Sequence, residues 1–244
     1  MEQKEKIQKI SKKEINKIFS KYEDNGIIST ETEKRFSEII NKQMGGDVII
    51  STINDRLGRF NKLPSVIDGF AYQILKESKN KDIVKKLHSA LPDGVINLQD
   101  SMELNYQPLQ TLLIDKEFQK ADKLTQEYLC KIVEQKNKIR KKWLYFTDIQ
   151  FVPRDDLLVI DLLWRIYSRG KFGFSVQKKI WIVNNKKWDK LWKKIKWIEI
   201  SSGIMKRYPQ GFSWTLDAPE GHLPLFNQLR GTQSLAYLFK NINW

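Results

Sequence analysis

The 244-residue chain has few of the residues that most often build redox, metal and acid–base sites. Cys130 is its one cysteine, which excludes an internal disulfide, a thiolate zinc site and a paired redox motif and predicts a core position. Its two histidines, His88 and His222, leave few candidates for a general acid or base near neutral pH. We therefore expect no bound metal and no histidine-based catalysis.

Long hydrophobic runs are also missing. No stretch of about 18 apolar residues occurs, so we expect no membrane-spanning helix. The lysine-rich start lacks the apolar core of a secretory signal, and its acids, Glu2, Glu5 and Glu14, are atypical of an organelle transit peptide. These absences predict a soluble protein that works in the compartment where it is made.

The motifs of the common enzyme classes are absent as well. The chain has no Gly-rich phosphate loop, no nucleophile elbow and no zinc-protease histidine pair. Its nearest carboxylate pair, Asp155 and Asp156, follows Pro153, where it suits the capping of a helix start. We infer a binding protein without catalytic residues, not an enzyme.

Positive charge and tryptophan are present, and both are concentrated in the second half. The formal net charge is +14; residues 1–100 carry 18 Lys+Arg against 15 Asp+Glu, or +3, and residues 101–244 carry 25 against 14, or +11. All eight tryptophans lie between Trp143 and Trp244. These shifts predict an N-terminal domain over 1–100 and a C-terminal domain over 101–244.

Apolar residues recur with helical spacing in both parts. In the N-terminal part they predict a helical bundle, with a capping box of Thr30 and Glu33 opening its second helix. The turn from Lys21 to Thr32 has the outline of a calcium loop, but these two residues stand where anchoring carboxylates are needed, so we predict no calcium site. The predicted helices lie around residues 7–19, 36–40, 66–75 and 83–91.

In the C-terminal part, the apolar pattern after Pro108 predicts two consecutive helices interrupted near Asp115, and a later helix that ends near Tyr167. A stripe of tryptophans follows at helical spacing. No alternating pattern is long enough for a sheet, so the predicted fold class is all-α. The stripe consists of Trp181, Trp188, Trp192 and Ile195.

The segment from Arg165 to Lys196 contains eleven Lys or Arg and one acid, Asp189. Cations among aromatic residues are found in nucleic-acid grooves and on surfaces that associate peripherally with membranes. Tryptophans at helical spacing also form core stripes whose intervening lysines face solvent. We favour the core stripe, because no nucleic-acid-binding motif occurs; membrane association stays open.

Two loops rich in glycine, proline and aromatic residues flank these helices, over 167–177 and 208–232. Their sequences closely resemble the Genomes Uncoupled Four family over about residues 106–240, whereas the segment from Lys193 to Lys206 has no clear counterpart. The motifs that carry the resemblance are Pro153-x-x-Asp-Leu157, Ile160-Asp-x-Leu-Trp164, Tyr167-Ser-x-Gly170, Phe172-Gly-Phe-Ser-Val-Gln177, Ala218-Pro-x-Gly-His-Leu-Pro224 and Leu229-Arg-Gly-Thr-Gln233.

The resemblance implies an all-helical C-terminal domain shaped like a cupped hand, preceded by a helical extension. It implies binding of protoporphyrin IX and magnesium protoporphyrin IX, without a catalytic cofactor. It also implies stimulation of magnesium chelatase in chlorophyll biosynthesis, through the large porphyrin-binding subunit. A basic nucleic-acid-binding module, and a signalling or scaffold domain that has lost the ligand, remain as alternatives.

A porphyrin is a flat apolar plate with anionic propionates at one edge, so it needs an apolar cleft with a cationic rim. Arg230 suits bidentate contact with a propionate. His222 we expect to bond the backbone of its loop, with axial ligation of magnesium as the alternative. Phe174 and Val176 also suit a helix core. The predicted apolar porphyrin-binding residues are Phe172, Phe174, Val176, Phe212, Trp214, Leu216 and Leu223.

Composition bears on location too. Lys, Ile and Asn are abundant where Arg, Leu and Gln would serve, which suggests an AT-rich genome. With no transit peptide expected, this favours a plastid-encoded protein of the chloroplast stroma, and a cyanobacterial cytoplasm is the alternative.

Overall fold

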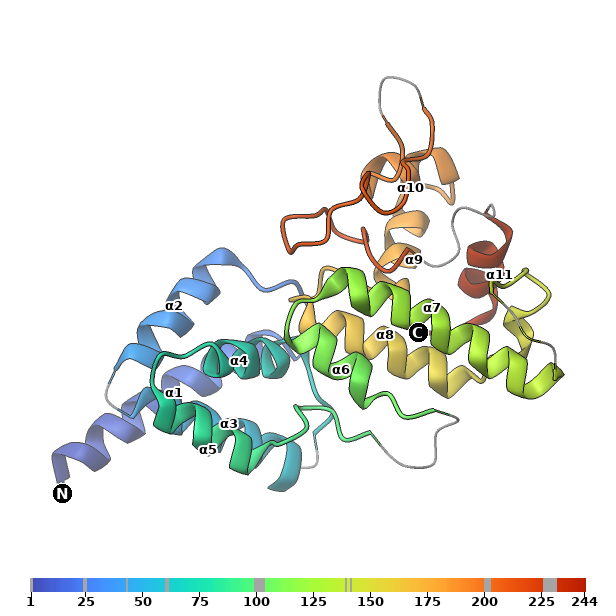
Figure 1. Cartoon of the computed structure of the whole chain (residues 1–244). Coiled ribbons are helices and arrows are strands. Elements are labelled where there is room, and N and C mark those ends of the chain that lie inside the picture. Colours follow the sequence, from blue (N-terminus) through green and yellow to red (C-terminus); the bar gives the residue numbers. More distant parts are fainter. Residues whose placement is uncertain are drawn as a thin grey trace. The chain divides into compact units, whose positions relative to one another are not determined.

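The computed structural model describes residues 2–23, 26–42, 44–59, 62–98, 104–138, 140, 142–199, 203–225 and 232–244, without the side chains of residues 2–11 and 59. The chain divides into two compact units, Met1–Asn97 and Leu98–Trp244. Within the described ranges the regular structure is helical, and an isolated antiparallel bridge joins Ile198 to Met205 (Figure 1). The predicted all-α fold class is confirmed.

The first unit packs its helices around α3, which contacts α1, α2, α4 and α5. Two glycines at the start of α3 allow this close packing. A Cβ atom on Gly45 would lie 1.7 Å from the carbonyl oxygen of Ile39, and one on Gly46 would lie 2.6 Å from Cδ1 of Ile83. The unit contains α1 (Glu2–Lys21), α2 (Thr30–Asn41), α3 (Gly45–Asn54), the π-helix η1 (Asp55–Arg59), α4 (Val66–Lys76) and α5 (Lys81–Ala90).

Sequence periodicity missed α3. The helix opens with two glycines, which are poor helix formers, and its polar side is narrow, formed by Asp47, Ser51 and Asn54, while the other residues of the helix are buried. Its central position explains how much of the helix is buried, because it contacts four other helices. The remaining predicted helices of this unit are confirmed, with small shifts at their ends.

The start of α2 corrects one prediction. Ser29, not Thr30, is the N-cap, and its hydroxyl accepts a hydrogen bond from the Thr32 N–H at 3.3 Å. The hydroxyl of Tyr22 bonds Thr32 at 2.7 Å, so hydroxyl groups tie down the turn that has the outline of a calcium loop. In the part of the chain that the structure describes, no cluster of acidic, His or Cys side chains could hold a metal ion.

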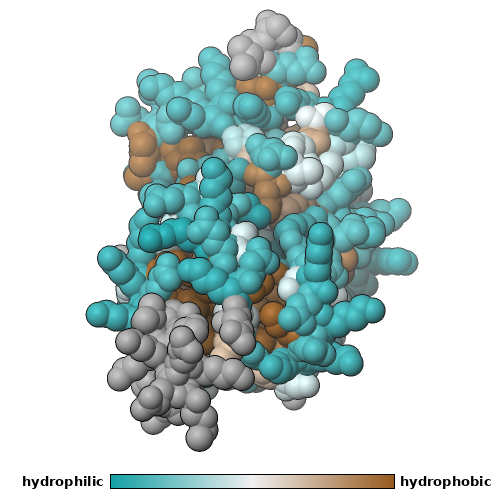
Figure 2. Space-filling model, turned by 90° about the vertical axis from the view of Figure 1, so that its left-hand side faces the viewer, coloured by the Kyte–Doolittle hydropathy of each residue, from teal (hydrophilic) through white to brown (hydrophobic). Residues whose placement is uncertain are grey.

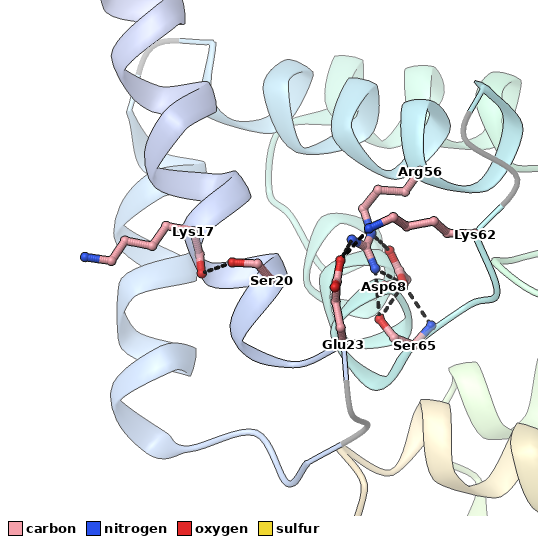
Figure 3. Close-up of polar contacts among 7 residues, drawn as sticks. All are labelled: Lys17, Ser20, Glu23, Arg56, Lys62, Ser65 and Asp68. Carbon is pink, nitrogen blue, oxygen red and sulfur yellow. Dashed lines mark hydrogen bonds and ion pairs between the residues drawn. The ribbon is translucent and has the colours of Figure 1, made fainter.

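A buried ion pair joins η1 to the start of α4 (Figure 3). Arg56 is 8% exposed, and its Nε donates to Oδ1 of the fully buried Asp68 at 3.0 Å. The same carboxylate accepts the N–H and the hydroxyl of Ser65, at 2.8 and 2.6 Å. Glu23, just after α1, accepts from Arg56 at 3.2 Å and from Lys62 at 2.6 Å. Every charge in this cluster is therefore compensated, as burial requires.

The second unit confirms the two consecutive helices after Asn105 and the later helix that ends at Tyr167. The predicted acidic pair, Asp155 and Asp156, lies in the first turn of that helix, and Asp156 also accepts a 2.6 Å hydrogen bond from the buried Tyr106 hydroxyl. Cys130 is buried, as predicted. The unit contains α6 (Gln107–Ile114), α7 (Phe118–Asn137), the 3-10 helix η2 (Ile149–Phe151), α8 (Arg154–Tyr167), α9 (Phe174–Val183), α10 (Trp188–Lys194) and α11 (Gln233–Asn241).

The tryptophan stripe lies on two helices and the residues after them. The chain turns between α9 and α10 at Asn185 and Lys186, which both have positive φ. Successive rings of Trp181, Trp188, Trp192 and Trp197 are 5.2, 5.2 and 5.1 Å apart between centroids, so the indoles pack on one another. Phe239 of α11 also packs against the first two, at 5.6 and 5.9 Å. The lysines between them, such as those at 187, 190 and 193, are exposed. This packing matches the core-stripe interpretation.

Hydrophilic residues cover most of the face shown in Figure 2, and hydrophobic residues are visible there only in small separate patches. Among the helices that the structure describes, none is both long enough and apolar enough to cross a membrane.

Candidate functional site

The first aromatic loop is a tight turn between α8 and α9. Gly173 has a φ of 139°, and a Cβ atom there would lie 2.8 Å from Oδ1 of Asp161, so the position requires glycine. That same oxygen accepts the Ser175 N–H at 2.8 Å and so satisfies a free donor at the start of α9. Burial raises the pKa of Asp161, and Arg165, at 2.9 Å, opposes this shift. The turn is thus held by a buried carboxylate.

The second aromatic loop is bonded to the first. Gly221 N–H donates to the Lys171 carbonyl at 2.8 Å, and Gly173 N–H donates to the Leu223 carbonyl at 3.0 Å. Gln177, which is fully buried on α9, donates from Nε2 to the carbonyls of both Gly221 and Pro224, at 3.0 and 2.8 Å. These bonds join two segments about fifty residues apart into one scaffold.

His222 fixes this loop with both ring nitrogens. Nδ1 donates to the Ile195 carbonyl at 2.6 Å, and Nε2 accepts the Ser213 N–H at 3.1 Å. Burial lowers the pKa of His222, with further lowering by Lys206 and Lys196, which favours the neutral ring that these bonds need. The expectation that His222 bonds backbone groups is confirmed, and neither nitrogen is left to ligate a metal.

Most of the predicted porphyrin-binding residues are buried in the core of the second unit. Phe172, for example, packs its ring edge against Phe118, 5.4 Å away, and near Trp164. Such side chains support the loops from beneath and offer almost no surface to a ligand in this structure. The buried members of the set are Phe172, Phe174 and Leu223, each at 0% exposure, Phe212 at 6% and Val176 at 7%.

Trp214 and Leu216 are the predicted residues that keep part of their surface exposed. Nε1 of Trp214 donates to the Pro209 carbonyl at 3.1 Å, and the ring of Tyr208 meets Trp214 edge-on at 5.9 Å. The ammonium of Lys171 donates to the Leu216 carbonyl. A small apolar surface of Tyr208, Trp214 and Leu216 therefore has a fixed backbone. Arg230 lies outside the described residues.

A second exposed surface, the aromatic segment, was missed by the sequence analysis. It consists of Trp143, Tyr145, Phe146 and Phe151, which are 36–56% exposed. Arg140 and Lys142 precede it and, with residues of α7, line a groove of about 690 Å³. The sequence signal that could have revealed this surface is the run Lys142-Trp-Leu-Tyr-Phe146, which combines a cation with aromatic residues outside any helical period.

The chain itself connects the two surfaces. The loop ends at Leu225, residues 226–231 follow, and α11 then packs against η2, which contains Phe151 of the aromatic segment. Arg230 belongs to this six-residue connection. The connection therefore joins the loop to a helix that contacts the aromatic segment.

Comparisons with known proteins match most of the chain. The chain is 44% identical to the protein ycf53 of Pyropia yezoensis over 190 residues, which are 78% of this chain and 79% of that protein. It is 39% identical to a Ycf53-like protein of Synechocystis over 181 residues, 74% of this chain and 76% of that protein. The first alignment covers more residues than the second unit contains, so it extends into the first unit.

A plant relative and a solved structure point to the same family. The chain is 34% identical to a chloroplastic tetrapyrrole-binding protein of Arabidopsis thaliana, over 52% of this chain and 50% of that protein. The structure of GUN4 from Chlamydomonas reinhardtii matches with a TM-score of 0.52 and 34% identity, over 60% of this chain and 93% of that one. A family model described as GUN4-like matches residues 99–241, within the second unit. On this match and these identities, the chain belongs to the GUN4-like family.

Proposed function

We propose that this protein is a non-catalytic tetrapyrrole-binding regulator whose second unit binds the ligand. The observation that carries the proposal is the pair of exposed aromatic surfaces in that unit, one of them beside Arg140 and Lys142. Aromatic rings suit the apolar faces of a macrocycle, and cations suit its propionates. The relative in Arabidopsis thaliana that is named for tetrapyrrole binding supports the same ligand class.

The ligand we propose is protoporphyrin IX or magnesium protoporphyrin IX. Trp214 and Leu216 provide one apolar surface and the aromatic segment provides another, with Arg230 on the connection between them as the propionate ligand. Phe172, Phe174, Val176, Phe212 and Leu223 support this site from the core. Because both nitrogens of His222 are engaged, a magnesium porphyrin would receive no axial ligand from this residue.

The regulatory role is the part of the proposal that rests on the family alone. We propose that the ligand-bound protein stimulates magnesium chelatase in chlorophyll biosynthesis by contacting its large porphyrin-binding subunit. The relatives come from algae, a cyanobacterium and a plant chloroplast, which supports the chloroplast stroma as location, with a cyanobacterial cytoplasm as the alternative.

Quenching of tryptophan fluorescence by deuteroporphyrin and its magnesium form tests the ligand. We expect saturable quenching, weakened at least tenfold in apparent affinity by Trp214→Ala and by Arg230→Ala, and also weakened by Phe146→Ala. Loss of one charge-assisted contact to a propionate is worth about 1.5–3 kcal/mol, or roughly tenfold or more.

Two variants in the first unit serve as matched controls. Arg35→Ala removes an exposed arginine, and Leu63→Ala removes an apolar side chain that is 87% exposed. Neither should change the titration. If the folded protein shows no saturable quenching by either porphyrin, the proposal that it binds a porphyrin is wrong.

A further inference from the structure

The end of the second loop is held by bonds of two kinds. Four successive carbonyl oxygens accept hydrogen bonds at 2.8–3.0 Å from groups that do not titrate near neutral pH. The next bond is different, because the Leu225 N–H donates at 2.6 Å to Oδ1 of Asp122, a carboxyl group on α7. The four accepting residues and their donors are Gly221 with Gln177, His222 with Trp197, Leu223 with the Gly173 N–H, and Pro224 with Gln177.

Asp122 is a buried acid with little compensation. It is 7% exposed, and burial raises the pKa of its carboxyl to about 7 although the bond from Leu225 favours the ionised form. The nearby lysines of α7 pair with other acids in solvent, Lys120 with Glu117 at 3.1 Å and Lys123 with Glu127 at 3.8 Å. Among the described residues, the ionised carboxylate thus has one backbone donor and no cation.

The titratable group that faces Asp122 from the candidate site is Tyr208. Burial raises the pKa of the Tyr208 hydroxyl, and the negative charge of Asp122 raises it further. The ring of Tyr208 in turn contacts Trp214. Asp122 on α7 therefore bonds the end of the loop at Leu225 and acts on Tyr208, which belongs to the exposed apolar surface of the same loop.

We propose that Asp122 is a proton-controlled positioning residue, whose neutral carboxyl holds the end of the loop on α7 and whose ionisation releases Leu225. A carboxylate that is buried without a cation is poorly solvated, and opening the loop admits water to it. Ionisation also strengthens the bond from Leu225, but one charge-assisted hydrogen bond does not offset the desolvation of a full charge.

The expected size of the effect follows from proton linkage. A solvated Asp has a pKa near 4, and the closed site holds the Asp122 pKa at about 7. Deprotonation between these two values therefore favours the open loop, and the ratio of open to closed loop rises about tenfold from about pH 6 to about pH 8.

Hydrogen–deuterium exchange on the full chain measures this opening directly. Peptides that cover residues 219–232 are compared at about pH 6 and about pH 8, with exchange corrected for its intrinsic pH dependence and with peptides of α4 as internal reference. In the wild type, we expect corrected exchange of the loop to be about tenfold faster at the higher pH.

Two variants separate ionisation from packing. Asp122→Asn keeps an oxygen that accepts from Leu225 but cannot ionise, so its exchange should be equal at both pH values. Asp122→Ala lacks the acceptor and should exchange fast at both. Wild-type exchange that is unchanged or slower at the higher pH, or an equal increase in Asp122→Asn, overturns the proposal.

The consequence for the ligand rests on the proposed function, and a parallel titration with deuteroporphyrin keeps the two apart. The affinity of the wild type for deuteroporphyrin should decrease when the pH is raised from about 6 to about 8, whereas Asp122→Asn should bind equally well at both pH values. Absence of binding together with pH-dependent exchange defeats the porphyrin site and supports the positioning role. Binding together with identical exchange in wild type and Asp122→Asn defeats the positioning role alone.

Discussion

Two buried aspartates, one in each unit, show how the surroundings of a carboxyl decide what it does. Asp68 accepts from the guanidinium of Arg56 and from the N–H and hydroxyl of Ser65. Asp122 accepts a hydrogen bond from the Leu225 N–H. The charge of the first acid is paired with a cation, and the pair joins η1 to the start of α4. Among the residues that the structure describes, the charge of the second acid is not paired with a cation, so its protonation state can change. A cation beside a buried acid therefore favours a fixed joint, whereas the lack of such a pair at Asp122 is what the proposed positioning role depends on.

The largest effect should come from removing the cation in the first unit. Arg56→Ala leaves the charge of Asp68 buried and unpaired, which we expect to lower the free energy of unfolding by about 3–5 kcal/mol. Urea unfolding followed by circular dichroism measures this loss. Arg56→Ala combined with Asp68→Asn should recover part of it, and a double variant as unstable as the single one would contradict the comparison.

The pH dependence of stability should identify the switch in the second unit. The folded-state pKa of Asp122 is raised from 3.8 to about 7, so its contribution to stability is complete below about pH 4 and is lost as the pH rises through about 7. The loss approaches about 1.4 kcal/mol per pH unit between these values. The difference between wild-type and Asp122→Asn unfolding curves isolates it, because the other groups titrate alike in both proteins. A difference that does not vary with pH rules out the raised pKa.

A smaller effect should follow from crowding the loop that Asp122 holds. Gly221 has a φ of 75°, and a Cβ atom there would lie 2.7 Å from Cδ1 of Ile180. Gly221→Ala should cost about 2–4 kcal/mol in thermal or urea unfolding, from backbone strain and overpacking together. Gly203→Ala is the matched control, because φ is 66° and nothing lies within 4 Å of the added atom. It should show the backbone strain alone, about 1–2 kcal/mol.

The smallest effect tests a neutral polar anchor of the first unit. Ser29→Ala removes the N-cap of α2 and should cost about 1 kcal/mol, whereas Thr30→Ala should be nearly neutral. Urea unfolding of the two variants compares them directly. Equal losses would mean that the cap register taken from the structure is wrong.

Sequence patterns predicted those elements whose apolar residues are periodic. The helices α6, α7 and α8 have clear apolar faces, and their prediction is confirmed. The same method missed α3, which opens with two glycines and has only a narrow polar side. It also joined α9 and α10 into one tryptophan stripe, because the turn between them, at Asn185 and Lys186, contains no glycine or proline that would mark it in the sequence.

Sequence pattern alone did not separate exposed aromatic residues from buried ones. Aromatic residues in Gly/Pro loops were taken as ligand contacts, but Phe172 and Phe174 are fully buried, whereas the exposed rings of Trp143 and Tyr145 were overlooked. Aromatic side chains serve core and surface equally well, so residue type alone does not separate the two positions.

The sequence by itself determined the all-α class, the basic and tryptophan-rich second part, and the family, because these depend on composition, local period and motif identity. The tertiary structure alone decided which aromatic rings stay exposed, how His222 uses both nitrogens, and that Asp122 meets Leu225 across a hundred residues of chain. Burial and hydrogen-bond partners arise from segments distant in sequence, and they set the pKa values on which the proposed positioning role depends.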